Sequence, residues 1–122
     1  MIYELVKHDN YRGFTYIVKL TEPWVFINGK YQPSGQRAWL SGYVEMPKKY
    51  RRHRRNIYHP DFWRADVTVG LNWSGMLDEH FEELPAVWAV GFDCQVKHLD
   101  HYKQVPEVEE HCKRLLDQLL DE

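Results

Sequence analysis

The residues best suited to bind an anion form a run of six cations, interrupted by one tyrosine and one histidine, at positions 48–55. Lysine and arginine contact phosphate oxygens through charge-assisted hydrogen bonds, and arginine can do so with two parallel bonds. An interleaved aromatic ring can stack on a base. The run therefore predicts a site for a phosphorylated, ring-bearing ligand; a solvated loop or a contact with an anionic protein are the alternatives. The candidate residues are Tyr50, Arg51, Arg52, Arg54 and Arg55, with Trp39 and Tyr43 on a nearby predicted strand.

A second group of residues combines carboxylates with imidazoles. Asp93, His98, Asp100 and His101 could hold a divalent metal, and a bound metal could activate water. Their spacing matches no established metal-ligand motif, and one further acid, Asp66, is expected on a neighbouring strand. A structural or surface role is therefore favoured, and a metal-dependent hydrolase or nuclease remains an alternative function. We predict no catalytic residue and no cofactor.

Glycines interrupt three predicted strands at positions where a packing side chain is normally expected. Residues 65–75 and 87–94 alternate between a bulky face and a small or polar one, with Gly70 and Gly91 inside them, and Gly42 lies inside an earlier strand. Such glycines mark a bulge or a close approach by another backbone or a ligand. If the strands are neighbours, the glycines could leave a shallow depression; a bulge or a crossing helix is the alternative. Hydrogen-bonding groups at its edges would come from Ser41, Tyr43, Thr68, Asn72 and Asp93.

Three blocks of sequence, in order, resemble a family of small phage and prophage proteins. The blocks are Gly42-Tyr43-Val44-x-x-Pro47, residues 69–75 and residues 87–94, and the match extends over roughly residues 37 to 102. The family carries a Gly-Tyr-Val-x-x-Pro segment, a His-Gly-Gly-Leu-Thr-(Tyr/Phe)-Ser segment and a Trp-Trp-x-Gly-Phe-Asp-Cys-x-His-x-x-Asp segment. Thr68 and Val96 stand where the family has histidines. The family has no assigned activity, so the resemblance implies a phage origin and a shared fold.

The length and composition indicate one domain spanning residues 1–122. Aromatic residues make up 15% of the chain, enough both to fill a small core and to line a surface that stacks flat ligands. The net charge of −2 makes bulk nucleic-acid binding unfavourable. Neither a signal peptide nor an apolar run approaching the ~20 residues of a membrane span is visible. We therefore expect the protein to be located in the cytoplasm of a host bacterial cell and to have no membrane partner.

The pattern of turn residues and alternating side chains predicts mainly β structure. Residues 8–12 are rich in turn formers and predict the turn of a first hairpin. Asn28-Gly29 predicts a second hairpin with a type I′ turn, because both central residues of that turn need a positive φ. The connection between Gly75 and Pro85 is long enough to carry a short helix. The predicted strands are 2–7, 13–20, 24–27, 37–46, 65–73 and 86–94.

A C-terminal helix is predicted to open at Pro106, since proline suits the first helical position. Apolar residues recur along one face of this helix, which is typical of a helix that packs on a sheet. These residues are Val108, Cys112, Leu115, Leu116, Leu119 and Leu120. The predicted fold is α+β: a mainly antiparallel sheet of five or six strands with this amphipathic helix on one face.

These features together favour a non-enzymatic binding protein. The phage resemblance predicts a counter-defence role, in which the protein sequesters a nucleotide-like signal molecule. An inhibitor that binds a host defence protein directly is the first alternative, and the metal-dependent enzyme described above is the second. A homo-oligomer is compatible with each of these functions.

Overall fold

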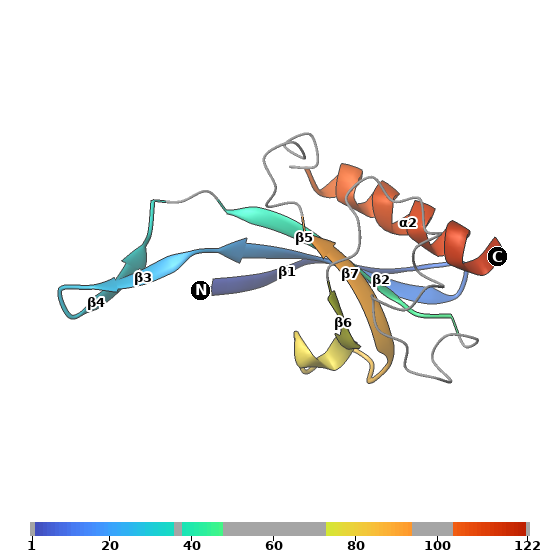
Figure 1. The fold of residues 1–122 in the computed structure, drawn as a ribbon, viewed down its shortest axis with the longest axis horizontal. Helices are drawn as coiled ribbons and strands as arrows, with labels where there is room; N and C mark the ends of the chain where they lie inside the picture. Colours follow the sequence, from blue (N-terminus) through green and yellow to red (C-terminus); the bar gives the residue numbers. More distant parts are fainter. Residues whose placement is uncertain (1, 36–37, 48–72, 94–103, 122) are drawn as a thin grey trace.

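The computed structural model describes residues 2–35, 38–47, 73–93 and 104–121. Figure 1 shows a curved sheet, one helix lying across one of its faces, and a two-stranded ribbon that extends away from the end of the sheet. The predicted strand at 65–73 is described only from residue 73 onward. The cationic run at 48–55 lies outside the described residues, as do positions 94–103.

The main sheet has five strands in the order β1-β2-β5-β7-β6, and every neighbouring pair is antiparallel. One C-terminal helix packs on it, which confirms the predicted α+β class. The ribbon pairs β3 with β4 and forms a separate sheet. The five strands of the main sheet are β1 (Ile2–Tyr11), β2 (Phe14–Glu22), β5 (Trp39–Glu45), β6 (Trp73–Met76) and β7 (Trp88–Asp93).

The first hairpin turns later than the sequence predicts. Strand β1 continues through the turn formers at 8–10 to Tyr11, and the turn consists of Arg12 and Gly13, with φ of 53° and 87°. The predicted hairpin is confirmed, but residues 8–11 belong to the strand and not to the turn, because cross-strand pairing outweighs local preference here. Asn10 pairs with Thr15, and the Thr15 hydroxyl lies 3.2 Å from the side-chain oxygen of Asn10.

The second hairpin confirms the predicted type I′ turn. Strands β3 (Trp24–Ile27) and β4 (Lys30–Pro33) flank Asn28 and Gly29, whose φ angles are 53° and 76°. Both values are positive, as this turn type requires. The two short strands form the ribbon that projects from the body in Figure 1.

The connection between β6 and β7 carries a short 3₁₀ helix, η2 (Leu77–Glu79), where the sequence allowed a short helix. Leu77 is fully buried, and its backbone N–H donates to the carbonyl oxygen of Val87 at 2.8 Å. These contacts fold the connection back toward the sheet. The residue that follows η2, His80, is thereby placed beside the sheet.

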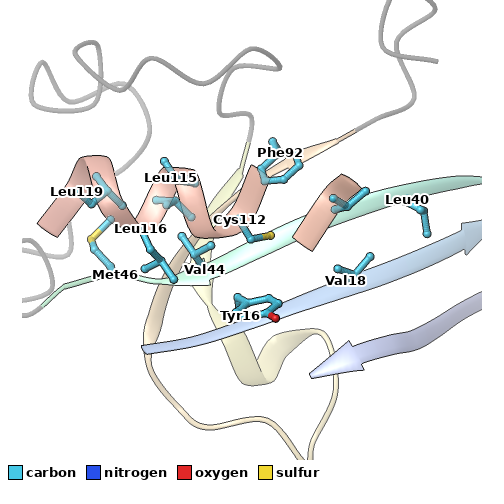
Figure 2. Close-up of a cluster of buried hydrophobic side chains, with 12 residues drawn as sticks. Tyr16, Val18, Leu40, Val44, Met46, Phe92, Cys112, Leu115, Leu116 and Leu119 are labelled. Atoms are coloured by element: carbon cyan, nitrogen blue, oxygen red, sulfur yellow. The ribbon is translucent and has the colours of Figure 1, made fainter. Parts of the chain in front are cut away.

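The C-terminal helix α2 (Val105–Asp121) includes the predicted proline in its first turn and packs on β2 and β5. Its apolar stripe meets the side chains that point to this face of the sheet (Figure 2). Five of the six predicted helix residues are fully buried, and Leu120 is partly buried. The main core consists of Tyr16, Val18, Leu40, Val44, Met46, Val90, Phe92, Val108, Cys112, Leu115, Leu116 and Leu119.

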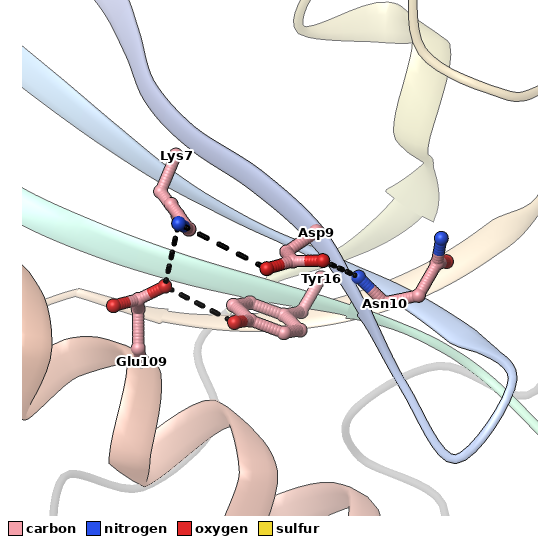
Figure 3. Close-up of polar contacts among 5 residues, drawn as sticks. All are labelled: Lys7, Asp9, Asn10, Tyr16 and Glu109. Carbon is pink, nitrogen blue, oxygen red and sulfur yellow. Dashed lines mark hydrogen bonds and ion pairs between the residues drawn. The ribbon is translucent and has the colours of Figure 1, made fainter.

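Polar contacts also fix the helix to the first hairpin. The buried Tyr16 hydroxyl donates to Oε1 of Glu109 at 3.1 Å, and Nζ of Lys7 lies 3.7 Å from the same oxygen (Figure 3). Burial, together with the contact to Glu109, raises the pKa of Tyr16, so its phenol remains a hydrogen-bond donor. Farther along α2, Asp117 accepts from the Tyr11 hydroxyl at 3.0 Å and from the Arg12 guanidinium at 2.9 Å.

Candidate functional site

The predicted site residues that the structure describes share the face of the sheet opposite α2, here called the open face. Leu40 and Val44 of β5 point into the core under α2, so the alternate residues Trp39 and Tyr43 point to the other side. Asp93 is the register partner of Ser41 and lies on this same face. The other candidates lie outside the described residues: Tyr50, Arg51, Arg52, Arg54, Arg55, Thr68, Asn72, His98, Asp100 and His101.

The two strand glycines that the structure describes, Gly42 and Gly91, do not leave a depression on the sheet, and Gly70 lies outside the described residues. Gly42 and Gly91 lie on opposite faces, and neighbouring side chains fill the space above each. A Cβ on Gly42 would lie 2.7 Å from Sγ of Cys112 and 2.8 Å from Cε1 of Phe92. The absence of a side chain at Gly42 therefore lets Phe92 of β7 and Cys112 of α2 pack closely against β5. A helix crossing the strand glycines was one of the alternatives to a depression. Gly91 instead admits the ring of Tyr43.

A second, smaller core lies on the open face. The segment after β6 folds over this face, so that Leu77 and Leu84 pack against Ile17, Tyr43 and Ala89. Partly buried residues surround this core, among them Leu5, Trp73 and Phe81. The small core holds the rings of Tyr43 and Trp73 in place and fixes the position of the polar groups beside them.

Lys19 of β2 lies at the edge of this small core, half-buried. Its Nζ lies 3.3 Å from Nδ1 of His80, 4.8 Å from the ring centroid of Tyr3 and 5.1 Å from that of Tyr43. Cations are attracted to the faces of aromatic rings at such distances. We call Lys19, His80, Tyr3, Tyr43 and Trp73 the Lys19 cluster.

The imidazole of His80 stacks within this cluster and stays neutral. Its ring centroid lies 4.2 Å from that of Tyr43 and 4.4 Å from that of Trp73. Burial, and to a lesser extent the charge of Lys19, lowers the pKa of His80 to about 4. The ammonium of Lys19 donates to Nδ1, so the proton of the neutral ring is on Nε2. Nε2 is buried, and no described residue offers it a hydrogen-bond partner.

Lys19 lacks a carboxylate partner within the part of the chain that the structure describes. None of the ion pairs among those residues includes it, and its hydrogen-bond partner is the neutral His80. Burial lowers the pKa of Lys19, and the more distant charge of Asp93 opposes that shift. A half-buried cation with no carboxylate at ion-pair distance among the described residues favours the binding of an external anion.

Tyr43 connects the predicted site residues to the cluster. The side chain is buried, and this burial raises its pKa to about 12, while a hydrogen bond with Ser41 opposes part of the rise. The phenol is therefore protonated at neutral pH. Tyr43 contacts Trp73 edge-to-face, with a centroid distance of 5.2 Å and an interplanar angle of 86°.

Sequence reasoning missed Lys19, His80, Tyr3 and Trp73 as site residues. One signal was present: Lys19 is the single basic residue in a strand that is otherwise apolar or carries hydroxyl groups until Glu22. His80 offered no comparable signal, because it lies 61 positions from Lys19 in a connection without a motif.

The metal alternative gains no support from the described residues. They contain no group of three histidine, cysteine, aspartate or glutamate side chains that could hold an ion. Of the four predicted ligands, Asp93 alone belongs to them, so the metal site stays a prediction. No helix within the described ranges is long and apolar enough to cross a membrane.

Comparisons with protein-family models, with curated proteins and with solved structures found no match for this chain. The resemblance to phage proteins therefore stays a prediction. The class that the fold defines is an α+β protein with one helix on an antiparallel sheet. Its candidate site is a lysine held among aromatic rings on the opposite face.

The depressed pKa of His80 predicts a loss of stability in acid. The unfolded chain takes up a proton near pH 6.5, while the folded ring resists protonation down to about pH 4. The contribution of neutral His80 to the free energy of unfolding is thus fully present above pH 6.5 and is lost as the pH falls toward 4. Because the ring is only half-buried, water screening reduces the expected loss to about 1–2 kcal/mol. Urea unfolding of wild type and His80→Gln between pH 7 and 4 measures it; parallel curves would contradict the assignment.

Proposed function

We propose that this protein is a non-enzymatic binding protein that captures a phosphorylated, ring-bearing small molecule at the Lys19 cluster. The observation that carries the proposal is the environment of Lys19, a half-buried ammonium between two tyrosine rings and next to a neutral imidazole. A ligand phosphate supplies the anion at ion-pair distance that the described surroundings of Lys19 lack. A flat ring on the same ligand stacks on the exposed face of an aromatic side chain.

Tyr3 is the aromatic residue best placed for such stacking. Its side chain is 52% exposed, whereas Tyr43 is 6% exposed and serves as the floor of the cluster. Trp39 lies on the same face and is partly exposed, so a second ring is available along β5. In this proposal the cations at 48–55 add further phosphate contacts. We propose that this ligand is a nucleotide-like signal of a host defence, which the protein sequesters; this role agrees with the resemblance to phage proteins.

Replacing Lys19 with methionine tests this site. We expect Lys19→Met to weaken binding of ADP-ribose or a cyclic nucleotide by roughly 10- to 100-fold, because a charge-assisted hydrogen bond is lost. Methionine keeps most of the apolar stem, so the packing against Tyr43 changes little. Isothermal titration calorimetry measures the affinity, after a thermal-shift screen has selected the tightest nucleotide.

The matched control is Lys30→Met, which removes an exposed lysine on the ribbon. Binding should also weaken as salt increases, since phosphate contacts of partly exposed cations are screened. Equal losses of affinity in the two variants would show that the effect is general electrostatics and not the Lys19 cluster. Absence of a thermal shift with every nucleotide tested would argue against the proposed function.

A second function, inhibition of a host defence protein by direct binding, is favoured by the ribbon. Phe26 and Tyr31 face each other across β3 and β4 with a centroid distance of 5.1 Å, yet they are 62% and 70% exposed. Trp24 and Pro33 are the next pair on the same face. Exposed aromatic side chains of this kind are typical of protein-binding surfaces. An isolated two-stranded ribbon is marginally stable in water, so a partner would also stabilise it.

The double variant Phe26→Ser, Tyr31→Ser tests the second function. If the ribbon binds a host protein, the proteins retained from a bacterial lysate by the immobilised wild type will be lost with this variant. Lys19→Met should retain them, because its substitution lies on the body of the protein. The same set of proteins on all three samples would rule out a specific role of the ribbon, and nucleotide affinity should be unchanged in the double variant.

A further inference from the structure

We propose that Lys19 is a carbonyl-reactive amine, which captures its ligand reversibly as an imine at an aldehyde carbon or at a sugar carbon that opens to one. The inference rests on the proposed small-molecule site and names the reactive group of its ligand. It draws on three observations about Lys19: its position, its neighbours and its one hydrogen bond.

The position of Lys19 makes the neutral amine more accessible than in a solvent-exposed lysine. The side chain is half-buried beside Tyr43, and the described residues place no carboxylate at ion-pair distance. Desolvation without a paired anion disfavours the charged form, and lysines in such surroundings serve as nucleophiles toward carbonyl groups. The direction of the pKa shift of Lys19 agrees with this expectation.

The neighbours of Lys19 leave its amine available as a nucleophile. His80 is neutral, and its Nδ1 at 3.3 Å accepts a hydrogen from Lys19 in either protonation state of the amine. The contact orients the nitrogen and leaves the neutral amine accessible. A carboxylate partner would instead stabilise the ammonium, whose nitrogen has no lone pair for the reaction. The ring centroid of Tyr3 lies 4.8 Å from Nζ of Lys19, and Tyr3 is 52% exposed.

The reaction needs no oxidant, reductant or additional reactant. The ammonium of Lys19 first gives a proton to water, and the nitrogen lone pair then attacks the carbonyl carbon of the ligand. A C–N bond forms, the carbonyl π electrons move to oxygen, and a proton passes from nitrogen to that oxygen. The resulting carbinolamine takes up one proton from water and expels its hydroxyl as water, which leaves a protonated imine. The net change joins the ammonium and the carbonyl compound with release of one water.

The ligand class follows from the two requirements together. It carries a phosphate and a flat ring, as the proposed function demands, and it also carries a free aldehyde or a sugar whose anomeric carbon is unsubstituted. ADP-ribose meets these conditions, because its terminal ribose opens to an aldehyde. A cyclic nucleotide does not, since its ribose is blocked at the anomeric carbon. The inference therefore predicts that the first compound can be trapped covalently and that the second cannot.

The main comparison uses the wild-type protein, so its outcome does not depend on a variant that folds. Pyridoxal 5′-phosphate is the probe, because it combines a ring, a phosphate and an aldehyde. Borohydride reduces the imine to a stable amine, and peptide mass spectrometry then locates the label. We expect Lys19 to be labelled several-fold faster than Lys30 at pH 7, and His80→Phe to reduce this preference. ADP-ribose should leave a borohydride-stable adduct on Lys19.

Pyridoxine 5′-phosphate, which has an alcohol in place of the aldehyde, separates binding from reaction. Protection of Lys19 by this compound, together with labelling of Lys19 by the aldehyde, supports both the proposed site and the inference. Protection without preferential labelling overturns the inference and leaves the proposed site standing. A third outcome is that Lys19 is labelled preferentially, but pyridoxine 5′-phosphate does not protect it and no nucleotide binds measurably. This outcome supports the reactive amine and contradicts the proposed function. Labelling of Lys19 no faster than that of Lys30 overturns the inference in every case.

Discussion

Replacing Gly91 with alanine is expected to lower the free energy of unfolding by roughly 2–3 kcal/mol. Gly91 lies in the centre of β7, directly across from Tyr43 in β5. An added Cβ would lie 2.5 Å from Cε1 of the Tyr43 ring and 2.9 Å from the carbonyl oxygen of Gly42. The ring belongs to a buried side chain and the oxygen to the backbone, so neither can move away at low cost. Urea unfolding measures the difference.

The double variant Gly91→Ala, Tyr43→Leu provides the control. The smaller leucine side chain removes the contact between the Tyr43 ring and the new methyl group, so alanine at 91 should cost less in this background than in the wild type. Nucleotide affinity should also fall in Gly91→Ala alone, because a displaced Tyr43 ring no longer supports Lys19. An unchanged unfolding midpoint in Gly91→Ala would show that the sheet has more room at this position than the structure indicates.

Truncation of Leu116 is expected to have a comparable or larger effect on stability. Its side chain is fully buried between α2 and the sheet (Figure 2), and a leucine-to-alanine change at such a position costs about 2–5 kcal/mol. The loss combines the transfer free energy of the removed carbon atoms with the cavity that they leave. Far-UV circular dichroism during urea unfolding should show a lower midpoint for the sheet and the helix together.

Leu120→Ala is the matched control in the same helix. Leu120 lies one turn later and is only partly buried, so its truncation removes less apolar contact and should cost about 1 kcal/mol or less. The helix propensity of alanine matches or exceeds that of leucine, so the contrast reports on packing. Equal losses at 116 and 120 would contradict the way in which α2 packs on the sheet.

Local chemistry in the sequence determined the elements whose signals are contained within a few residues. Asn28-Gly29 predicted its hairpin because a type I′ turn depends on the φ angles of two adjacent residues. The spacing of Val108, Cys112 and Leu115 predicted a helix with one buried face, because the period of the apolar residues is a local property. The overall class followed, since short strands joined by turns and one terminal helix have few arrangements.

Predictions that required knowledge of strand neighbours failed or remained open. Residues 8–10 contain turn formers, yet they belong to β1 because β2 offers a full set of pairing partners. Gly42, Gly70 and Gly91 suggested one depression, but the register of β5 and β7 places the two described glycines, Gly42 and Gly91, on opposite faces, each filled by a neighbour. The alternation within a strand specifies two faces and does not specify what covers either of them.

The candidate site is the part that only the tertiary structure decided. Tyr43 and Asp93 were predicted from strand patterns, and the sheet register puts them on one face as expected. Lys19 and His80, by contrast, come from a strand and a connection 61 residues apart, and neither has a motif. They meet because Leu77 and Leu84 bury themselves on the open face and bring His80 with them. The perturbed pKa values of both side chains arise from that burial, which no local pattern in the sequence encodes.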